Sequence, residues 1–351
     1  MLYAILQELC ASGKNAECTV PCRLIPVIPP EAKEKVKFVK ANPLSSFTGI
    51  LRSSAFVLGG GTHIFDFGIK RRVVQILCRI LLMVMFARTF GKKVYLIGNG
   101  VGPLTSGWGT TLARLICQMA DSISVRDGES YKYLEKWGLT GKAVLSFDLS
   151  ALIEPAEIPE TAINNGRNVL GLSVSPVYEI YYNDKNWDIQ MVEKIAEVVN
   201  SWLETEPESE VWLFVFKGKS MDDDVLITER LREQLKPREK VKIIDYDPSP
   251  ANTLARISRC HVFIGTRYHS SLFAYLSGIP LIVLNYHSKC RALAEDIGLP
   301  EKAIVSLSEI LDGNFSNRLK NLIKSPGDFL ATLPTDTARK RAKDGIIGVI
   351  K

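Results

Sequence analysis

The chain alternates short apolar runs with longer helical segments, and this alternation limits the folds open to it. In the second half of the chain, apolar runs fall at residues 169–174, 211–216, 241–244, 261–264 and 281–284. Helical patterns separate them at 188–204, 222–235, 250–258 and 270–276, and another follows at 288–297. Short apolar runs between helices are typical of parallel strands that are buried on both faces of a sheet. We therefore predict a doubly wound α/β fold.

The first half of the chain shows the same alternation. Apolar runs at 36–39, 55–58, 93–98 and 122–125 predict strands, and helical patterns fall at 73–90, 109–119 and around Leu134. The chain begins in a helical pattern at Met1, so the first strand of an ordinary Rossmann-like domain is apparently missing. A chain of 351 residues is also too long for one ordinary hydrophobic core. We expect two Rossmann-like domains that face each other across a cleft.

A stretch rich in proline and acidic residues divides the two halves. It has no apolar period and is predicted to be the interdomain linker, at residues 155–166. The N-terminal domain is then 1–154 and the C-terminal domain 167–335. The last segment, 336–351, carries clustered lysine and arginine and is predicted to be a basic surface helix or a frayed tail.

Composition and charge exclude several classes of protein. With 46% apolar and 23% charged residues, the chain has the composition of a folded globular protein rather than a disordered one. The net charge of +6 is mild, and the basic residues are spread along the chain without interleaved aromatic residues. An anionic small substrate or an anionic membrane surface therefore fits better than nucleic acid.

The seven cysteines are scattered, and no pair of Cys or His motifs completes a zinc site at the usual spacing. We expect free thiols, no metal and a cytoplasmic protein without a signal peptide. The apolar helix at 73–90 is interrupted by Arg79 and Arg88, which makes membrane spanning costly, so we expect it to cover a sheet. Because Arg71 and Arg72 precede it, contact with the inner face of a membrane stays open as a second interpretation.

The strongest candidate site is the sequence IGTRYHSS at residues 264–271, between a predicted strand and a predicted helix. Such turns lie at the carboxyl ends of parallel strands, where ligands bind, and the N–H groups of a helix start attract anions. Arg267 adds a fixed positive charge and His269 a titratable group, with Thr266 and Ser270 beside them. This combination suits a phosphate. A histidine that only caps its helix is the alternative for His269.

Candidates also follow other predicted strands. In the N-terminal half these are Gly60, Gly61, Thr62 and Asp66 after the strand at 55–58, and Arg126 after the strand at 122–125. Glycines let a ligand approach the backbone, and an arginine binds carboxylate or phosphate with two parallel hydrogen bonds. A tight turn, a helix cap by Asp66 and a surface Arg126–Asp127 pair are the plain alternatives.

Two further strand ends lie in the C-terminal half. Lys289 follows the strand at 281–284 and is predicted to be a second anion contact. The acidic run at 222–224 is interpreted as a solvated helix start, because acidic side chains stabilise the N-terminal turn of a helix.

Five motifs occur in a fixed order between about residues 55 and 298. They are Gly59-Gly60-Gly61-Thr62 with Asp66, Gly100-Val101-Gly102-Pro103, Ser124-Val125-Arg126-Asp127-Gly128-Glu129-Ser130, Gly265-Thr266-Arg267-Tyr268-His269-Ser270, and Gly278-Ile279-Pro280 leading to Tyr286 and Lys289. Together they resemble the polysaccharide pyruvyl transferase family. The resemblance implies the two-domain glycosyltransferase fold called GT-B. It also implies transfer of a pyruvyl group from phosphoenolpyruvate to a sugar hydroxyl, with formation of a ketal and release of phosphate.

The resemblance implies that Arg126, Arg267 and His269 match the family's phosphoenolpyruvate-binding and catalytic positions, with Lys289 as an addition. Phosphoenolpyruvate is then a donor substrate, no cofactor is needed, and the acceptor is a glycan or a lipid-linked sugar. We hypothesise that His269 supplies or relays a proton.

The sequence departs from the family's pattern at two places. The strand and glycine-rich loop that usually open the family's chains are absent here, and Lys217-Gly218-Lys219 stands where members often have a histidine. Two other functions stay open. One is a GT-B glycosyltransferase that uses a nucleotide sugar, and the other is an inactive homologue that binds phosphoenolpyruvate.

Overall fold

The computed structural model describes residues 1–12, 17–66, 70–157, 168–218, 223–311 and 314–347. Most of the predicted linker, at 158–166, lies outside these residues. The chain forms two compact units, one of Met1–Ile153 with Asp336–Lys351 and one of Glu154–Thr335. The division therefore falls at the start of the proline- and acid-rich stretch.

The N-terminal unit is built on a parallel sheet with the strand order β3-β4-β5-β6. Its strands are β3 (Ala55–Ile64), β4 (Lys93–Val101), β5 (Ser122–Val125) and β6 (Ala143–Leu145), and they are connected by the helices α3 (Lys70–Thr89), α4 (Gly107–Met119) and α5 (Gly128–Lys136). A separate parallel pair, β1 (Cys18–Cys22) with β2 (Val36–Lys40), lies near α1 (Leu2–Ala11) and α2 (Pro43–Arg52).

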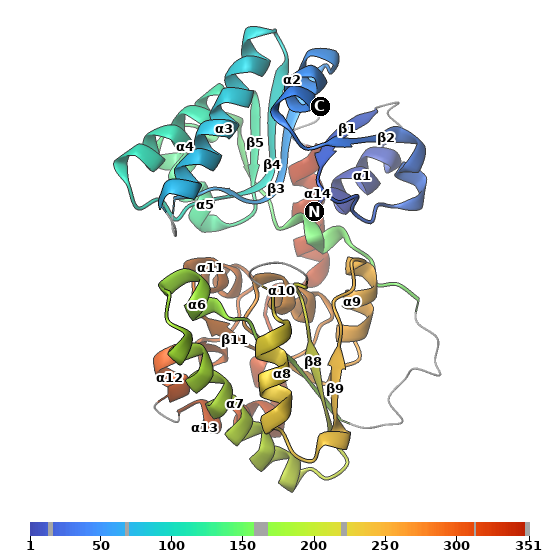
Figure 1. Ribbon diagram of the computed structural model, residues 1–351, viewed down its shortest axis with the longest axis vertical. Coiled ribbons are helices and arrows are strands. Elements are labelled where there is room, and N and C mark those ends of the chain that lie inside the picture. The colour runs from blue at the N-terminus through green and yellow to red at the C-terminus, as the bar shows by residue number, and fades with distance from the viewer. Residues whose placement is uncertain (13–16, 67–69, 158–167, 219–222, 312–313, 348–351) are drawn as a thin grey trace. The chain divides into compact units, whose positions relative to one another are not determined.

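Helices α3 and α4 lie side by side on one face of this sheet, while α1 and the last helix, α14 (Thr335–Ile347), lie on the other (Figure 1). The inner face of α3 carries Leu77, Ile80, Val84 and Ala87, which pack in one buried cluster with residues of α4 and the sheet. The prediction that this helix covers a sheet is therefore confirmed. Among the described residues, no helix is long and apolar enough to cross a membrane.

The prediction that the strand at 55–58 ends before the glycines is wrong. Strand β3 runs on to Ile64, and its register with β4 shifts between Thr62 and Ile64. A Cβ atom at Gly59 would lie 2.7 Å from Cδ1 of Ile5 in α1, and one at Gly60 would lie 2.5 Å from Sδ of Met1. The absence of side chains at these two glycines therefore makes room for the protein's own helix.

The C-terminal unit is built on a parallel sheet with the order β12-β11-β10-β7-β8-β9. The strands are β7 (Val169–Ser173), β8 (Glu210–Phe214), β9 (Val241–Ile244), β10 (Val262–Gly265), β11 (Leu281–Asn285) and β12 (Ile304–Ser306). From β7 the chain adds β8 and β9 on one side, and then returns to add β10, β11 and β12 on the other. The strand order therefore reverses between β7 and β10, which is the position where doubly wound sheets bind ligands.

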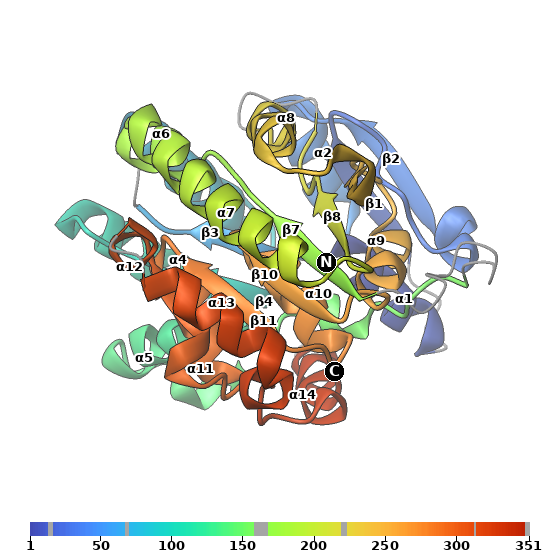
Figure 2. The same cartoon turned by 90° about the horizontal axis from the view of Figure 1, so that it is seen from below.

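Helices connect these strands and cover the sheet. They are α6 (Val177–Tyr182), α7 (Lys185–Thr205), α8 (Val225–Gln234), α9 (Pro250–Ile257), α10 (Tyr268–Leu276), α11 (Ser288–Asp296), α12 (Leu307–Leu311) and α13 (Asn314–Lys324). Figure 2 shows the long helix α7 beside α13, and the two are in contact. Every residue of β7, β8 and β10 is buried, as expected for central strands covered on both faces.

Over residues 336–347 the C-terminal segment is a helix and not a frayed tail. Helix α14 belongs to the N-terminal unit and buries Ala338, Ala342 and Ile346. The hydroxyl of Ser146 donates a hydrogen bond to the carbonyl of Arg341 at 3.1 Å. The apolar face of α14 gives the physical reason, because its small side chains allow the helix to pack closely on the unit.

Candidate functional site

The turn between β10 and α10 is attached to the neighbouring strand at the switch point of the sheet. Both the backbone N–H and the hydroxyl of Thr266 donate hydrogen bonds to the carbonyl of Ser173, at 3.0 and 2.8 Å. Ser173 is the last residue of β7. Thr266 is 1% exposed. The turn is thus fixed at the place where the fold is expected to bind a ligand.

Arg267 is held by a carboxylate from another strand end. Its Nε atom lies 2.9 and 2.8 Å from the two oxygens of Asp224, and its Nη2 atom lies 2.6 Å from Oδ1. The carboxylate of Asp224 also accepts hydrogen bonds from the backbone N–H groups of Phe216 and Lys217. Asp224 is fully buried, whereas the Arg267 side chain is 20% exposed. The guanidinium group is therefore anchored by a buried carboxylate, while the Arg267 side chain as a whole stays partly exposed.

This arrangement corrects the interpretation of the acidic run. Asp224 does not lie in a solvated helix start, and its side chain makes no capping hydrogen bond to α8. It is buried because it forms an ion pair with Arg267 and accepts backbone hydrogen bonds, which together offset the cost of removing a carboxylate from water. Asp222 lies outside the described residues.

His269 is the second residue of α10 and is partly exposed. Its ring lies edge-on to Tyr268 at a centroid distance of 5.3 Å and to Phe273 at 6.4 Å. These aromatic contacts orient the imidazole at the helix start, where the positive end of the helix dipole lies. A guanidinium group, an imidazole and a helix N-terminus are thus brought together within three residues of one turn.

Ser270 stabilises the turn from within. Its hydroxyl donates a hydrogen bond to the carbonyl of Arg267 at 2.8 Å, and the residue is fully buried. The structure thus gives the hydroxyls of Thr266 and Ser270 positioning roles. Their direct contact with substrate stays a prediction.

Lys289 follows the adjacent strand β11. It lies near the start of α11, where the imidazole of His287 accepts a hydrogen bond from the backbone N–H of Lys289 at 3.2 Å. The ammonium group lies 5.4 Å from the centre of the Tyr286 ring. His287 is therefore the N-cap of α11. Lys289 is a partly exposed cation at the next strand end along the sheet edge, as an anion contact requires.

The N-terminal unit has its own cluster of polar residues at the strand ends. Arg126 directly follows β5 and is 4% exposed. It donates hydrogen bonds to Asp127 at 3.3 Å, to Asp148 at 3.2 Å and to the hydroxyl of Thr62 at 2.8 Å. The alternative interpretation, a surface pair of Arg126 with Asp127, is wrong because the network is buried. It connects the end of β3 to the end of β5 and to the segment after β6.

Asp66 ties two loops together. Its carboxylate accepts hydrogen bonds from the backbone N–H and the hydroxyl of both Thr105 and Ser106. Burial raises the pKa of Asp66, but these four hydrogen bonds outweigh burial and hold the pKa below its ordinary value. The structure therefore gives Asp66 a role in fixing the loop before α4. The alternative that Asp66 caps the next helix involves residues 67–69, which lie outside the described part of the chain, and the contact of Asp66 with substrate stays a prediction.

His63 and Gly61 lie beside the Arg126 network. A Cβ atom at Gly61, which has a φ of +104°, would lie 3.1 Å from Nε2 of His63. The pKa of His63 is lowered by burial and by the charge of Arg126, against a hydrogen bond with the backbone of Gly60 that raises it. His63 is thus a neutral imidazole at neutral pH that keeps an exposed part of its surface. Substrate contacts of Gly60, Gly61 and Thr62 stay predictions.

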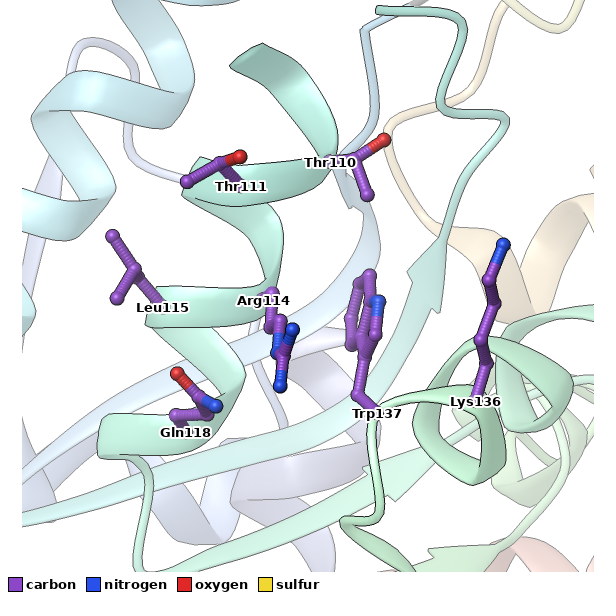
Figure 3. A pocket seen from close by; sticks show the side chains of 7 residues that line it. All are labelled: Thr110, Thr111, Arg114, Leu115, Gln118, Lys136 and Trp137. Atoms are coloured by element: carbon purple, nitrogen blue, oxygen red, sulfur yellow. The ribbon is translucent and has the colours of Figure 1, made fainter. Parts of the chain in front are cut away.

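A surface hollow of about 530 Å³ lies elsewhere in the N-terminal unit (Figure 3). Its lining residues come from α4 and from the end of α5: Thr110, Thr111, Arg114, Leu115, Gln118, Lys136 and Trp137. None of the sequence-predicted site residues lines it. Within the described part of the chain, no three His, Cys, Asp or Glu side chains form a group that could hold a metal ion.

A family model described as polysaccharide pyruvyl transferase matches residues 3–288. The chain belongs to the polysaccharide pyruvyl transferase family. The match covers every predicted site residue except Lys289, which lies one residue beyond it. Among curated proteins, the chain is 23% identical over 317 residues to the amylovoran biosynthesis protein AmsJ of Erwinia amylovora, covering 87% of this chain and 73% of that protein.

Solved structures confirm the GT-B-like fold. The UDP-GlcNAc 2-epimerase of Methanocaldococcus jannaschii superposes with a TM-score of 0.64 at 11% identity, covering 99% of this chain and 94% of that one. The enzyme of the same name from Neisseria meningitidis, bound to UDP-GlcNAc, has a TM-score of 0.62 at 13% identity, covering 99% and 96%. At such low identity these likenesses show the fold alone.

Sequence reasoning missed the two acidic residues that hold the arginines. The sequence pattern predicts a solvated Asp224, and it does not single out Asp148. For Asp224 the available signal is the predicted strand at 211–216 that precedes it, since strand ends of a parallel sheet meet at one edge. Asp148 follows β6, a strand that the sequence pattern does not predict. Which acid meets which arginine depends on strand order, and the sequence pattern does not give that order.

Proposed function

We propose that this member of the family transfers a pyruvyl group from phosphoenolpyruvate to a sugar of a glycan or glycolipid, forming a ketal and releasing phosphate. The observation that carries the proposal is the turn after β10. There, buried Asp224 anchors Arg267 beside His269 at a helix start. This turn offers positive groups of the kinds that bind phosphate and carboxylate.

Phosphoenolpyruvate carries both of those anionic groups, which fits a site with more than one cation. We assign Arg267 to bind one of them, since its side chain is partly exposed. Lys289 lies at the end of the adjacent strand β11 and supplies a second cation along the same sheet edge. The buried carboxylate of Asp224 keeps the guanidinium in one orientation, so less conformational freedom is lost on binding.

The reaction requires two proton transfers. The methylene carbon of phosphoenolpyruvate gains a proton and becomes a methyl group, and two hydroxyls of the acceptor sugar form bonds to the central carbon as the bond to phosphate oxygen breaks. Of the two hydroxyl protons, one balances the methyl group and the other leaves with phosphate. We assign His269 to supply or relay a proton and to stabilise the departing phosphate, because an imidazole can do both near neutral pH.

The N-terminal unit is assigned to the acceptor. Arg126 positions the ends of β3 and β5, and His63 beside it is a neutral, partly accessible imidazole. Such a group can accept a proton from a sugar hydroxyl, which Arg126 in its network with two carboxylates cannot do. In this proposal Arg126 holds the strand ends that form the acceptor side and does not itself transfer a proton.

The test is phosphate release from phosphoenolpyruvate across a panel of glycans and lipid-linked sugars. Arg267→Ala and His269→Ala are expected to lower the rate by about a hundredfold or more, the range typical of lost charge stabilisation or general acid–base catalysis. Arg232→Ala is the matched control, since this exposed arginine on α8 pairs only with Glu229 among the described residues. A His269→Ala variant that releases phosphate at the wild-type rate would refute the assigned role.

Melting temperatures measured with phosphoenolpyruvate and with nucleotide sugars, read together with phosphate release, separate the two other functions. Stabilisation against heat by a nucleotide sugar but not by phosphoenolpyruvate would favour a nucleotide-sugar glycosyltransferase. Stabilisation by phosphoenolpyruvate without phosphate release on any acceptor would favour an inactive binding homologue.

A further inference from the structure

The net positive charge of this chain is concentrated in one stretch of its N-terminal unit. Between residues 35 and 120 the sequence holds twelve Lys and Arg but a single acidic residue, Asp66. Asp66 is buried and its carboxylate accepts hydrogen bonds, and it offsets only one of these positive charges. Because the whole chain has a net charge of +6, the remainder is net negative. The basic residues themselves are spread along the chain as expected, and the net charge of this stretch arises because acidic residues are almost absent from it.

The same stretch exposes large apolar side chains on three helices. Leu44 on α2 is 75% exposed, Leu82 on α3 is 57% exposed, and Trp108 on α4 is 79% exposed. We call the surface that carries them the α2–α3–α4 face, and define it by Leu44, Leu51, Ile76, Arg79, Leu82, Met85, Phe90, Trp108, Arg114 and Leu115.

These helices form one continuous layer. The rings of Phe47 on α2 and Phe86 on α3 lie 4.7 Å apart, and Phe86 lies 4.7 Å from Phe90. Helix α3 packs in turn against α4 (Figure 1). Because Leu77, Ile80, Val84 and Ala87 turn inward to the sheet, the opposite side of α3 points away from the core.

Cations are interspersed with the exposed apolar groups. Neither Arg79 nor Arg114 forms an ion pair with any described residue, whereas Arg88 and Lys93 pair with Asp121 at the end of the layer. Arg114 also lines the hollow of Figure 3 together with Lys136, and no carboxylate lines that hollow. The face thus combines insertable apolar side chains with positive charge.

We propose that the α2–α3–α4 face docks this protein on an anionic lipid bilayer, with the apolar side chains inserted at the headgroup level. Charge complementarity selects this occupant. A second copy of the chain would bring two positive faces together, which is repulsive, and nucleic acid would leave Leu44, Leu82 and Trp108 without apolar contact. A bilayer with anionic headgroups offers negative charge to the arginines and an apolar interior to the exposed apolar side chains.

The test is sedimentation of the full chain with vesicles, without donor or acceptor, so that its result is independent of the proposed reaction. Vesicles of phosphatidylcholine alone are compared with vesicles that also contain phosphatidylglycerol. We expect binding only to the anionic vesicles, weakening with salt. Replacing Arg79 and Arg114 by Gln is expected to weaken binding about fivefold for each arginine.

The apolar contribution is tested with a matched pair of variants. Leu82→Gln with Trp108→Gln is expected to weaken vesicle binding at least about tenfold. Leu226→Gln, at a residue on α8 that is 82% exposed, is expected to bind like the wild type. Melting temperatures of all variants verify folding.

Four outcomes would overturn the proposal. The first two are equal binding to neutral and anionic vesicles, and no binding to either. The third is unchanged vesicle binding of the Leu82/Trp108 variant. The fourth is that duplex nucleic acid displaces the protein from vesicles and also binds the Leu82/Trp108 variant. Self-association that Leu82→Gln abolishes would instead identify the face as an interface between copies.

Discussion

Arg267 owes its position to a carboxylate that lies 43 residues earlier in the chain. A long arginine side chain that is partly exposed to water can adopt many rotamers, and holding one of them costs conformational entropy. Three short contacts to fully buried Asp224 restrict it, and the hydrogen bonds from Phe216 and Lys217 restrict the carboxylate in turn. The position of the predicted anion-binding group is therefore a property of two strand ends, not of one motif.

Replacing Asp224 by Asn should test this anchoring. Because the change removes one partner of a buried ion pair, we expect the free energy of unfolding to fall by about 3 kcal/mol. We also expect a higher KM for phosphoenolpyruvate, since Arg267 loses its fixed orientation. Urea unfolding and steady-state phosphate release measure the two effects. Asp223→Asn, at the partly exposed neighbour, is the control. Equal behaviour of the two variants would contradict the anchoring role.

His63 should make stability depend on pH. Its pKa is lowered by burial and by the charge of Arg126, so below the ordinary histidine pKa of about 6.5 the unfolded chain binds a proton that the folded chain does not. The free energy of unfolding should then fall as pH decreases from about 7 towards 5. His63→Gln removes this contribution. The difference in the free energy of unfolding between variant and wild type, measured by urea titration, should therefore change between about pH 7 and about pH 5. A gap that is constant with pH would refute the prediction.

The turn between β10 and α10 depends on a glycine. A Cβ atom at Gly265 would lie 2.7 Å from the hydroxyl oxygens of both Ser270 and Ser271. The start of α10 therefore packs directly against the last residue of β10, which fixes Arg267 and His269 relative to the sheet. This close approach requires the smallest residue at the strand end.

Gly265→Ala should therefore loosen the site as well as the fold. We expect a loss of about 1–3 kcal/mol in the free energy of unfolding, because the added methyl group overpacks a buried position. Phosphate release should fall together with stability as α10 shifts. Gly327→Ala is the matched control, since a Cβ atom there meets nothing within 4 Å. If Gly265→Ala melted at the temperature of Gly327→Ala, the packing argument would fail.

At the scale of the whole molecule, the C-terminal helix α14 completes the N-terminal unit. It packs with Ala338, Ala342 and Ile346 buried, and Gly345 lies against Ser146 and Ser124. The two ends of the chain therefore share one unit, while residues 154–335 form the other.

Placing a charge on the buried side of α14 should affect one unit selectively. Ala342→Asp puts a carboxylate in a fully buried position and should destabilise the N-terminal unit by several kcal/mol, about the cost of burying an unpaired polar or charged group. Lys340→Asp places the same side chain on the exposed side of the same helix. Hydrogen exchange should rise in β4 and β5 for Ala342→Asp only, with β7 and β10 unchanged. Equal exchange in both units would contradict this assignment of α14.

The sequence alone determined the alternation of strands and helices, the division near residue 154 and the family, because these depend on local periodicity and on ordered motifs. It also placed Arg267 and His269 at a strand-to-helix turn, which α10 confirms. The tertiary structure decided that Asp224 anchors Arg267, that Asp148 holds Arg126, and that Gly59 makes room for α1. Each of these three contacts joins residues that lie far apart in the chain. Strand order brings them together, and local pattern carries no information about strand order.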